Sequence, residues 1–156
     1  MRHITTFQTF VNEAEEVFLN DDQIELLDQS CQGQWMVDPK SGLVNVRGNV
    51  DLSGKGLTDF LDIRFGGVNG NFHCKYNQLI NLEGAPQSVG GNFDCSYNQL
   101  TTLEGAPQEV DGNFYCRNNQ LTTLGGAPQE VGGDLYFSGN PGLPEDAWEV
   151  YQRTGM

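Results

Sequence analysis

Residues 89–109 read VGGNFDCSYNQLTTLEGAPQE, and residues 110–130 repeat them closely as VDGNFYCRNNQLTTLGGAPQE. Two further copies begin at Val68 and Val131, and a weaker copy begins at Val46 after a spacing one residue longer. A period of 21 residues is typical of a solenoid, in which each repeat forms one coil and buries its apolar face against its neighbours. We therefore expect a single stack of about five coils, one per copy.

Each repeat contains a short segment in which polar and apolar residues alternate, as in residues 92–96, NFDCS. This pattern predicts a strand with one buried face, so Phe93 and Cys95 would point inward. Strands of successive repeats would be parallel, and parallel strands need a crossover connection. The connection here contains too much Gly and Pro for a full helix, which favours an extended or 3₁₀ return.

The segment FDCSYNQLTTLEGAP resembles the leucine-rich repeat pattern L-x-L-x-x-N-x-L, with signature positions at Phe93, Cys95, Asn98 and Leu100. The sequence that follows is similar to the short bacterial subclass of this repeat. The repeat sequence is also similar to small leucine-rich repeat proteins of tailed bacteriophages. The resemblance covers about residues 46–143 and departs from the family by using Phe, Cys and Gly-Ala-Pro where Leu and Leu-Pro are usual. It implies an α+β solenoid with short parallel strands, in which the Asn column bonds backbone groups of adjacent coils.

The ends break the repeat, and we expect them to cap the stack. Residues 1–45 are expected to form an N-terminal helical and hairpin cap, with helices over 4–18 and 22–31, Asn20 or Asp21 as the second N-cap, and a hairpin turning at 38–42. The solenoid would occupy residues 46–142. A C-terminal helical cap would follow over 143–156 and bury Trp148.

The net charge of −13 and the pI of about 4.2 argue against direct binding to nucleic acid or to anionic membranes. The first residues lack a continuous apolar segment, so we expect no secretory signal and a cytoplasmic location. The four cysteines, Cys31, Cys74, Cys95 and Cys116, are then expected to be reduced thiols. A spacing of 21 between the last three does not match a metal motif, so they are expected to pack in the core.

No nucleophile elbow, phosphate-binding loop or paired-carboxylate signature occurs. We therefore expect neither an enzyme nor a bound cofactor or metal. The columns that point away from the core instead differ between coils, which suggests that packing does not constrain them. This outward face carries Asn49, Asp51, Ser53, Asn71, His73, Lys75, Asn92, Asp94, Ser96, Asn113, Tyr115, Arg117, Asp134, Tyr136 and Ser138.

Tyr and Arg are enriched among the residues that dominate protein interfaces. The sequence thus predicts a monomeric module that binds a protein partner of unknown identity through this face. The predicted contact residues are His73, Lys75, Asp94, Tyr115, Arg117 and Tyr136.

An acidic nucleic-acid mimic is the alternative function. Glu83 and Glu104 share a column, as do Glu109 and Glu130, although Gly125 and Ser88 interrupt these rows.

The N-terminal stretch MRHITTFQTFVNEAEE is similar to the capsid-targeting peptides on internal head proteins of T-even-type phages. The resemblance implies cleavage between Glu13 and Ala14 and packaging in the virion. A phage protein that is not packaged would act in the host cytoplasm, with this stretch serving only as a cap.

Overall fold

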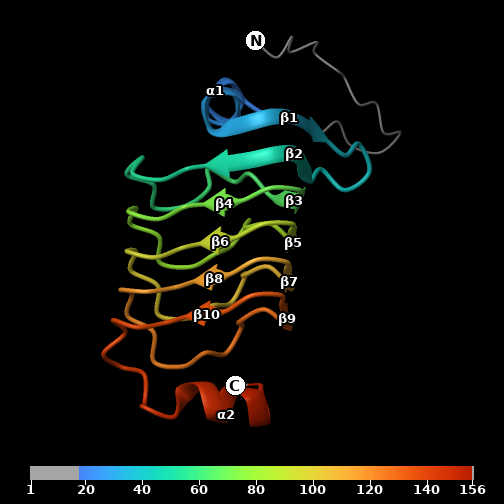
Figure 1. Ribbon diagram of the computed structural model, residues 1–156. Helices are drawn as coiled ribbons and strands as arrows, with labels where there is room; N and C mark the ends of the chain where they lie inside the picture. Colours follow the sequence, from blue (N-terminus) through green and yellow to red (C-terminus); the bar gives the residue numbers. More distant parts are fainter. Residues whose placement is uncertain (1–17, 156) are drawn as a thin grey trace.

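The computed structural model describes residues 18–155, which form a β-solenoid of parallel strands with a short helix at each end (Figure 1). Helix α1 (Asp21–Ser30) leads into an antiparallel hairpin of β1 (Cys31–Val37) and β2 (Val44–Asp51), and α2 (Ala147–Thr154) follows the last coil. Between them lie the strands β3 (Phe65–Val68), β4 (Phe72–His73), β5 (Ser88–Val89), β6 (Phe93–Asp94), β7 (Glu109–Val110), β8 (Phe114–Tyr115), β9 (Glu130–Val131) and β10 (Leu135–Tyr136). Residues 4–17 of the helix predicted over 4–18, and the predicted cleavage site at Glu13 and Ala14, lie outside the described residues.

Each coil contributes two short strands rather than the single strand predicted. The sheet order is β10-β8-β6-β4-β2-β3-β5-β7-β9, so two parallel ladders meet at β2. The ladder of β4, β6, β8 and β10 was predicted from the alternating segment, but that of β3, β5, β7 and β9 was not. One apolar Val before a Gly-rich turn offers too little alternation to reveal a strand.

The stack has four coils with two strands each, rather than the expected five. The weak copy at Val46 falls within β2, which pairs antiparallel with β1 from Val44 to Val50 and parallel with β3 and β4. This strand therefore belongs both to the hairpin and to the first layer of the stack.

The inward columns form the core, as predicted. The rings of Phe72, Phe93 and Phe114 stack in sequence, with centroid distances of 5.5 and 5.2 Å. Cys74, Cys95 and Cys116 form a second column with 0% exposure. Burying a phenylalanine side chain contributes roughly 1.5–3 kcal/mol, and the coils of Phe72, Phe93 and Phe114 each make that contribution.

The predicted asparagine ladder is confirmed. The Asn98 side-chain amide donates to the carbonyls of Cys74 and Cys95, both at 3.0 Å, and its Oδ1 accepts from the Leu79 N–H at 3.0 Å. Asn77, Asn119 and Asn140 make corresponding bonds. Each buried amide thus satisfies backbone groups of its own coil and of the preceding one.

The return segment is irregular chain that contains a tight turn, and no 3₁₀ helix occurs within residues 18–155. In one coil the Ala106 N–H donates to the Leu103 carbonyl at 3.0 Å, and Gly105 between them has a φ of 87°. A type II turn needs this conformation at its third residue, and glycine adopts it without strain. The Gly-Ala-Pro sequence therefore reverses the chain and then buries Ala106 and Pro107.

The helix and hairpin at the N-terminal end agree with their prediction. Asn20 caps α1 through a reciprocal pair of hydrogen bonds with Gln23, each of 2.9 Å. At the other end, the Tyr151 hydroxyl donates to the carbonyls of Ala127 and Pro128, both at 2.9 Å. Trp148 is half-buried and stacks on Tyr151 at 5.9 Å, so its predicted burial is partial.

Candidate protein-interaction face

The predicted contact residues lie along the outer surface of β4, β6, β8 and β10, and we call this surface the strand face. The parallel register places His73 beside Asp94, Asp94 beside Tyr115, and Tyr115 beside Tyr136. Lys75 and Arg117 follow two residues after His73 and Tyr115 and form a neighbouring column. The structure therefore brings all six predicted residues onto one side of the solenoid.

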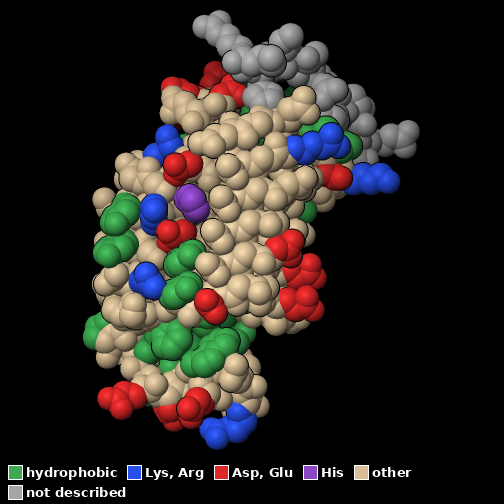
Figure 2. Space-filling view, in the orientation of Figure 1, with side chains coloured by type: hydrophobic (Ala, Val, Ile, Leu, Met, Phe, Trp, Pro, Cys, Tyr) green, Lys and Arg blue, Asp and Glu red, His purple; other side chains and the backbone are tan. Residues whose placement is uncertain are grey.

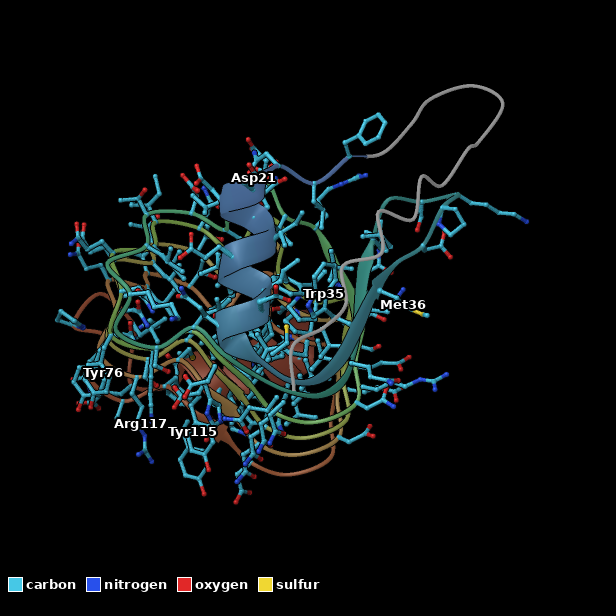
Figure 3. All side chains as sticks on the ribbon, turned by 90° about the horizontal axis from the view of Figure 1, so that it is seen from above. Asp21, Trp35, Met36, Tyr76, Tyr115 and Arg117 are labelled. Carbon is cyan, nitrogen blue, oxygen red and sulfur yellow. The ribbon has the colours of Figure 1, made fainter. Side chains whose placement is uncertain are left out.

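Tyr115, Arg117 and Tyr136 form a compact group, which we call the tyrosine–arginine cluster. The two phenol rings stack with centroids 4.8 Å apart and planes 6° apart. The Arg117 guanidinium carbon lies 4.4 Å from the Tyr136 centroid and 5.8 Å from that of Tyr115. Figure 3 shows Arg117, Tyr115 and Tyr76 projecting outward from the same side of the solenoid.

Both hydroxyl groups of the cluster are held by hydrogen bonds. The Asn113 amide donates to the Tyr115 hydroxyl oxygen at 2.8 Å, and the Tyr136 hydroxyl donates to the Asp134 carboxylate at 3.2 Å. The second bond and the Asp134 charge raise the pKa of Tyr136 above its ordinary value. The rings are consequently oriented before any partner arrives.

Lys75 differs from Arg117, because it already has a carboxylate partner. Its ammonium lies 3.7 Å from the Asp94 carboxylate. A partly exposed surface pair of this kind contributes roughly 0–1 kcal/mol. The two cations of the strand face are therefore in different electrostatic states, one paired and one without a carboxylate.

Sequence reasoning missed a second aromatic pair beside the strand face. Tyr76 and Tyr97 stack with centroids 4.6 Å apart, and both are exposed, at 55% and 47%. Each has a φ of 57°, so the backbone turns immediately after the strand and directs the ring outward. The signal was present in the sequence as a tyrosine at the same position of two successive repeats.

The outward asparagines, which the sequence analysis placed on the recognition surface, accept hydrogen bonds from the backbone of the next coil. The Asn71 Oδ1 accepts from the Asn92 N–H at 2.8 Å, and Asn49, Asn92 and Asn113 accept in the same way from the next coil. These side chains form a second ladder of hydrogen bonds to the backbone, and the last coil has Asp134 at the equivalent position. A Cβ at Gly91 would lie 2.3 Å from the Asn71 Oδ1, which explains why glycine precedes each asparagine.

The carboxylates of the alternative hypothesis lie elsewhere on the molecule. Glu109 and Glu130 are paired in register on β7 and β9, and both are exposed. Acidic side chains gather on the right of Figure 2, on the side where Figure 1 places β5, β7 and β9. Glu83 and Glu104 are exposed in the return segments.

The buried thiols offer no reactive site. Burial raises the pKa of Cys116 to about 12 and raises the pKa of Cys74 and of Cys95 well above the ordinary value. Thiols with raised pKa values are poor nucleophiles and poor metal ligands. Among residues 18–155, no group of three or more His, Cys, Asp or Glu side chains could hold a metal ion.

A cavity of about 960 Å³ opens between the last coil and α2, and we call it the terminal hollow. Its apolar lining includes Val131, Leu135, Phe137, Trp148 and Tyr151. Val131, Leu135 and Phe137 are only half-buried, because no further coil covers them. Tyr136 and Asp134 also line this hollow, so it adjoins the tyrosine–arginine cluster.

Comparisons with protein-family models, curated proteins and solved structures gave no match. The class of protein is defined by its strand topology, which within residues 18–155 is that of a parallel β-solenoid with two short helices. No helix within the described part of the chain is long and apolar enough to cross a membrane.

Proposed function

We propose that this protein is a non-enzymatic interaction module that binds a protein partner through its strand face. The tyrosine–arginine cluster is the observation that supports the proposal. Two stacked rings and a guanidinium are held together on an outer surface, where they contribute little to the core. Tyr and Arg dominate interface energetics, and side chains that are already ordered lose less entropy on binding.

We further propose that the repeat is of the leucine-rich type and that the terminal regions cap the stack. The asparagine ladder and the parallel strands support this assignment, whereas the second strand in each coil departs from the resemblance. The capping role is supported by α2, since Tyr151 bonds two carbonyls of the last return segment. The resemblance to phage proteins suggests a host or virion protein as the partner and the host cytoplasm as the place of action.

The test compares capture of proteins from a bacterial host lysate by the wild-type chain and by a variant with Tyr115, Arg117 and Tyr136 replaced by Ala. The variant should lose the captured partner but melt within a few degrees of the wild type, because the cluster lies outside the core. A variant with Tyr76→Ala and Tyr97→Ala serves as the matched control and should retain the partner. Equal capture by the triple variant and the wild type would refute the strand face as the binding site.

The acidic mimic is the second candidate function, and it is favoured by the adjacent carboxylates of Glu109 and Glu130. Neutralising Glu83, Glu104, Glu109 and Glu130 to Gln tests it. A mimic would lose its partner in this variant and in moderate salt, because the attraction between exposed charges is screened. Strand-face binding would survive the four substitutions.

A further inference from the structure

Arg117 is a cation without an anion. No carboxylate among residues 18–155 lies within 4.0 Å of its guanidinium, although the chain contains 21 acidic residues. Its Nε is buried and has no hydrogen-bond partner in the described structure. The guanidinium carbon lies 4.4 Å from the Tyr136 ring centroid, so a cation–π contact holds the positive charge over the ring.

The charges around Arg117 limit the kind of anion that fits. Asp94 lies in β6, and Asp134 directly precedes β10, so their carboxylates lie on either side of β8. They would repel a dianionic phosphate more strongly than a single carboxylate. Because the chain as a whole has a net charge of −13, it would also repel a peptide with several consecutive acidic residues. One carboxylate next to neutral residues fits best.

The terminal hollow provides an adjacent place for a neutral apolar group. Tyr136 belongs to the tyrosine–arginine cluster and to the terminal hollow, since its ring lies against Arg117 and the residue also lines the hollow. In Figure 2, hydrophobic side chains continue from this part of the strand face toward the C-terminal end. A short peptide could therefore place one side chain on Arg117 and the next apolar side chain against Phe137 and Trp148.

We propose that the partner presents a peptide segment with one acidic residue beside an apolar residue, the carboxylate binding Arg117 and the apolar side chain entering the terminal hollow. This inference rests on the proposed function and specifies its ligand. A guanidinium and a carboxylate form two parallel hydrogen bonds, which gives direction as well as affinity. The apolar group would cover the half-exposed Val131, Leu135 and Phe137.

A displayed library of random heptapeptides, panned against the full chain, tests the proposal. Wild-type chain should enrich peptides that pair Asp or Glu with a large apolar residue. Arg117→Gln should abolish the enrichment of peptides that contain Asp or Glu. It should also lower the affinity for the enriched peptide by about tenfold, as expected for loss of a charged hydrogen-bonded pair. Arg64→Gln is the matched control, because it removes the same charge from an exposed residue beside β3, outside the strand face, and it should leave the selection unchanged.

Fluorescence anisotropy with the enriched peptide then separates the possible outcomes. Replacing the acidic residue of the peptide by its amide should weaken its binding to the wild-type chain but not to the Arg117→Gln variant. In the protein, Trp148→Ala should weaken binding of the peptide, because the apolar residue of the peptide loses a contact in the terminal hollow. Tighter binding of a phosphoserine version, or enriched peptides without an acidic residue, would overturn the carboxylate proposal. If such peptides still required Tyr115 and Tyr136, the proposed function would stand. Equal enrichment on the wild type and on the triple Ala variant would overturn both.

Discussion

Asn98 and Asn71 show that one residue type performs two separate tasks in each coil. Asn98 is buried at 8% exposure and uses both ends of its amide inside the turn. Asn71 lies on the outer surface and uses its Oδ1 to accept one N–H from the next coil. Both side chains replace backbone hydrogen bonds that the bent coil cannot make for itself.

Asn98→Ala should lower the free energy of unfolding by roughly 1–3 kcal/mol, because the buried Leu79 N–H loses its acceptor. The Cys74 and Cys95 carbonyls each lose one of two amide donors and keep Asn77 or Asn119. Tyr97→Ala is the neighbouring control and should cost less, since Tyr97 is 47% exposed. Urea denaturation of the three proteins measures the difference. Similar losses at the two positions would contradict the ladder.

Gly91→Ala should also destabilise the protein, by roughly 1–3 kcal/mol, because the added methyl group overlaps the Asn71 side chain. Gly125→Ala is the matched control. A Cβ there would meet nothing closer than 3.5 Å, and Gly125 does not have a positive φ, so the substitution should be neutral or slightly stabilising. Thermal melts of both variants provide the test, and equal melting temperatures would argue against the second asparagine ladder.

At the scale of the element, the strand ladders place equivalent side chains in rows, and burial of a row shifts the pKa values of its titratable groups. Cys74, Cys95 and Cys116 are adjacent in the row, and burial raises the pKa of each thiol. In the unfolded chain these thiols ionise near a pKa of 9.0. Above that pH the unfolded state therefore loses protons that the folded state retains.

The free energy of unfolding should consequently fall as the pH rises from about 9 toward 12, by about 1.4 kcal/mol per pH unit for each buried thiol. Urea denaturation between pH 8 and 11 measures this slope. A variant with the three cysteines replaced by Ala should be less stable at pH 8 but should lose stability less steeply with pH. The same slope in both proteins would show that the thiols are not the groups responsible.

At the scale of the whole molecule, each coil contacts only its neighbours, so stability should be a sum over coils. Deleting residues 89–109 removes one 21-residue period and joins Ser88 to Val110, which preserves every ladder. The shortened protein should unfold cooperatively at a lower temperature. Circular dichroism during heating measures this.

Deleting residues 89–110 instead removes one residue more, and it also removes the inward Val of the joined coil. This control should be much less stable than the 21-residue deletion, because the strand of that coil loses its buried side chain and its register. Equal stability of the two deletions would contradict a register set by the period.

The sequence by itself determined the period, the inward columns, the buried asparagine ladder and the N-cap residue of helix α1. Each of these depends on a residue and its near neighbours, or on the same position one repeat later. Only the tertiary structure decided the second strand of each coil, because Val89 or Val110 forms a strand by pairing with the next coil rather than by local pattern. The outward asparagine ladder and the unpaired Arg117 likewise depend on distances between coils. A repeat states which residues recur, but the stacking of coils decides which of their polar groups are already satisfied and which are left for a partner.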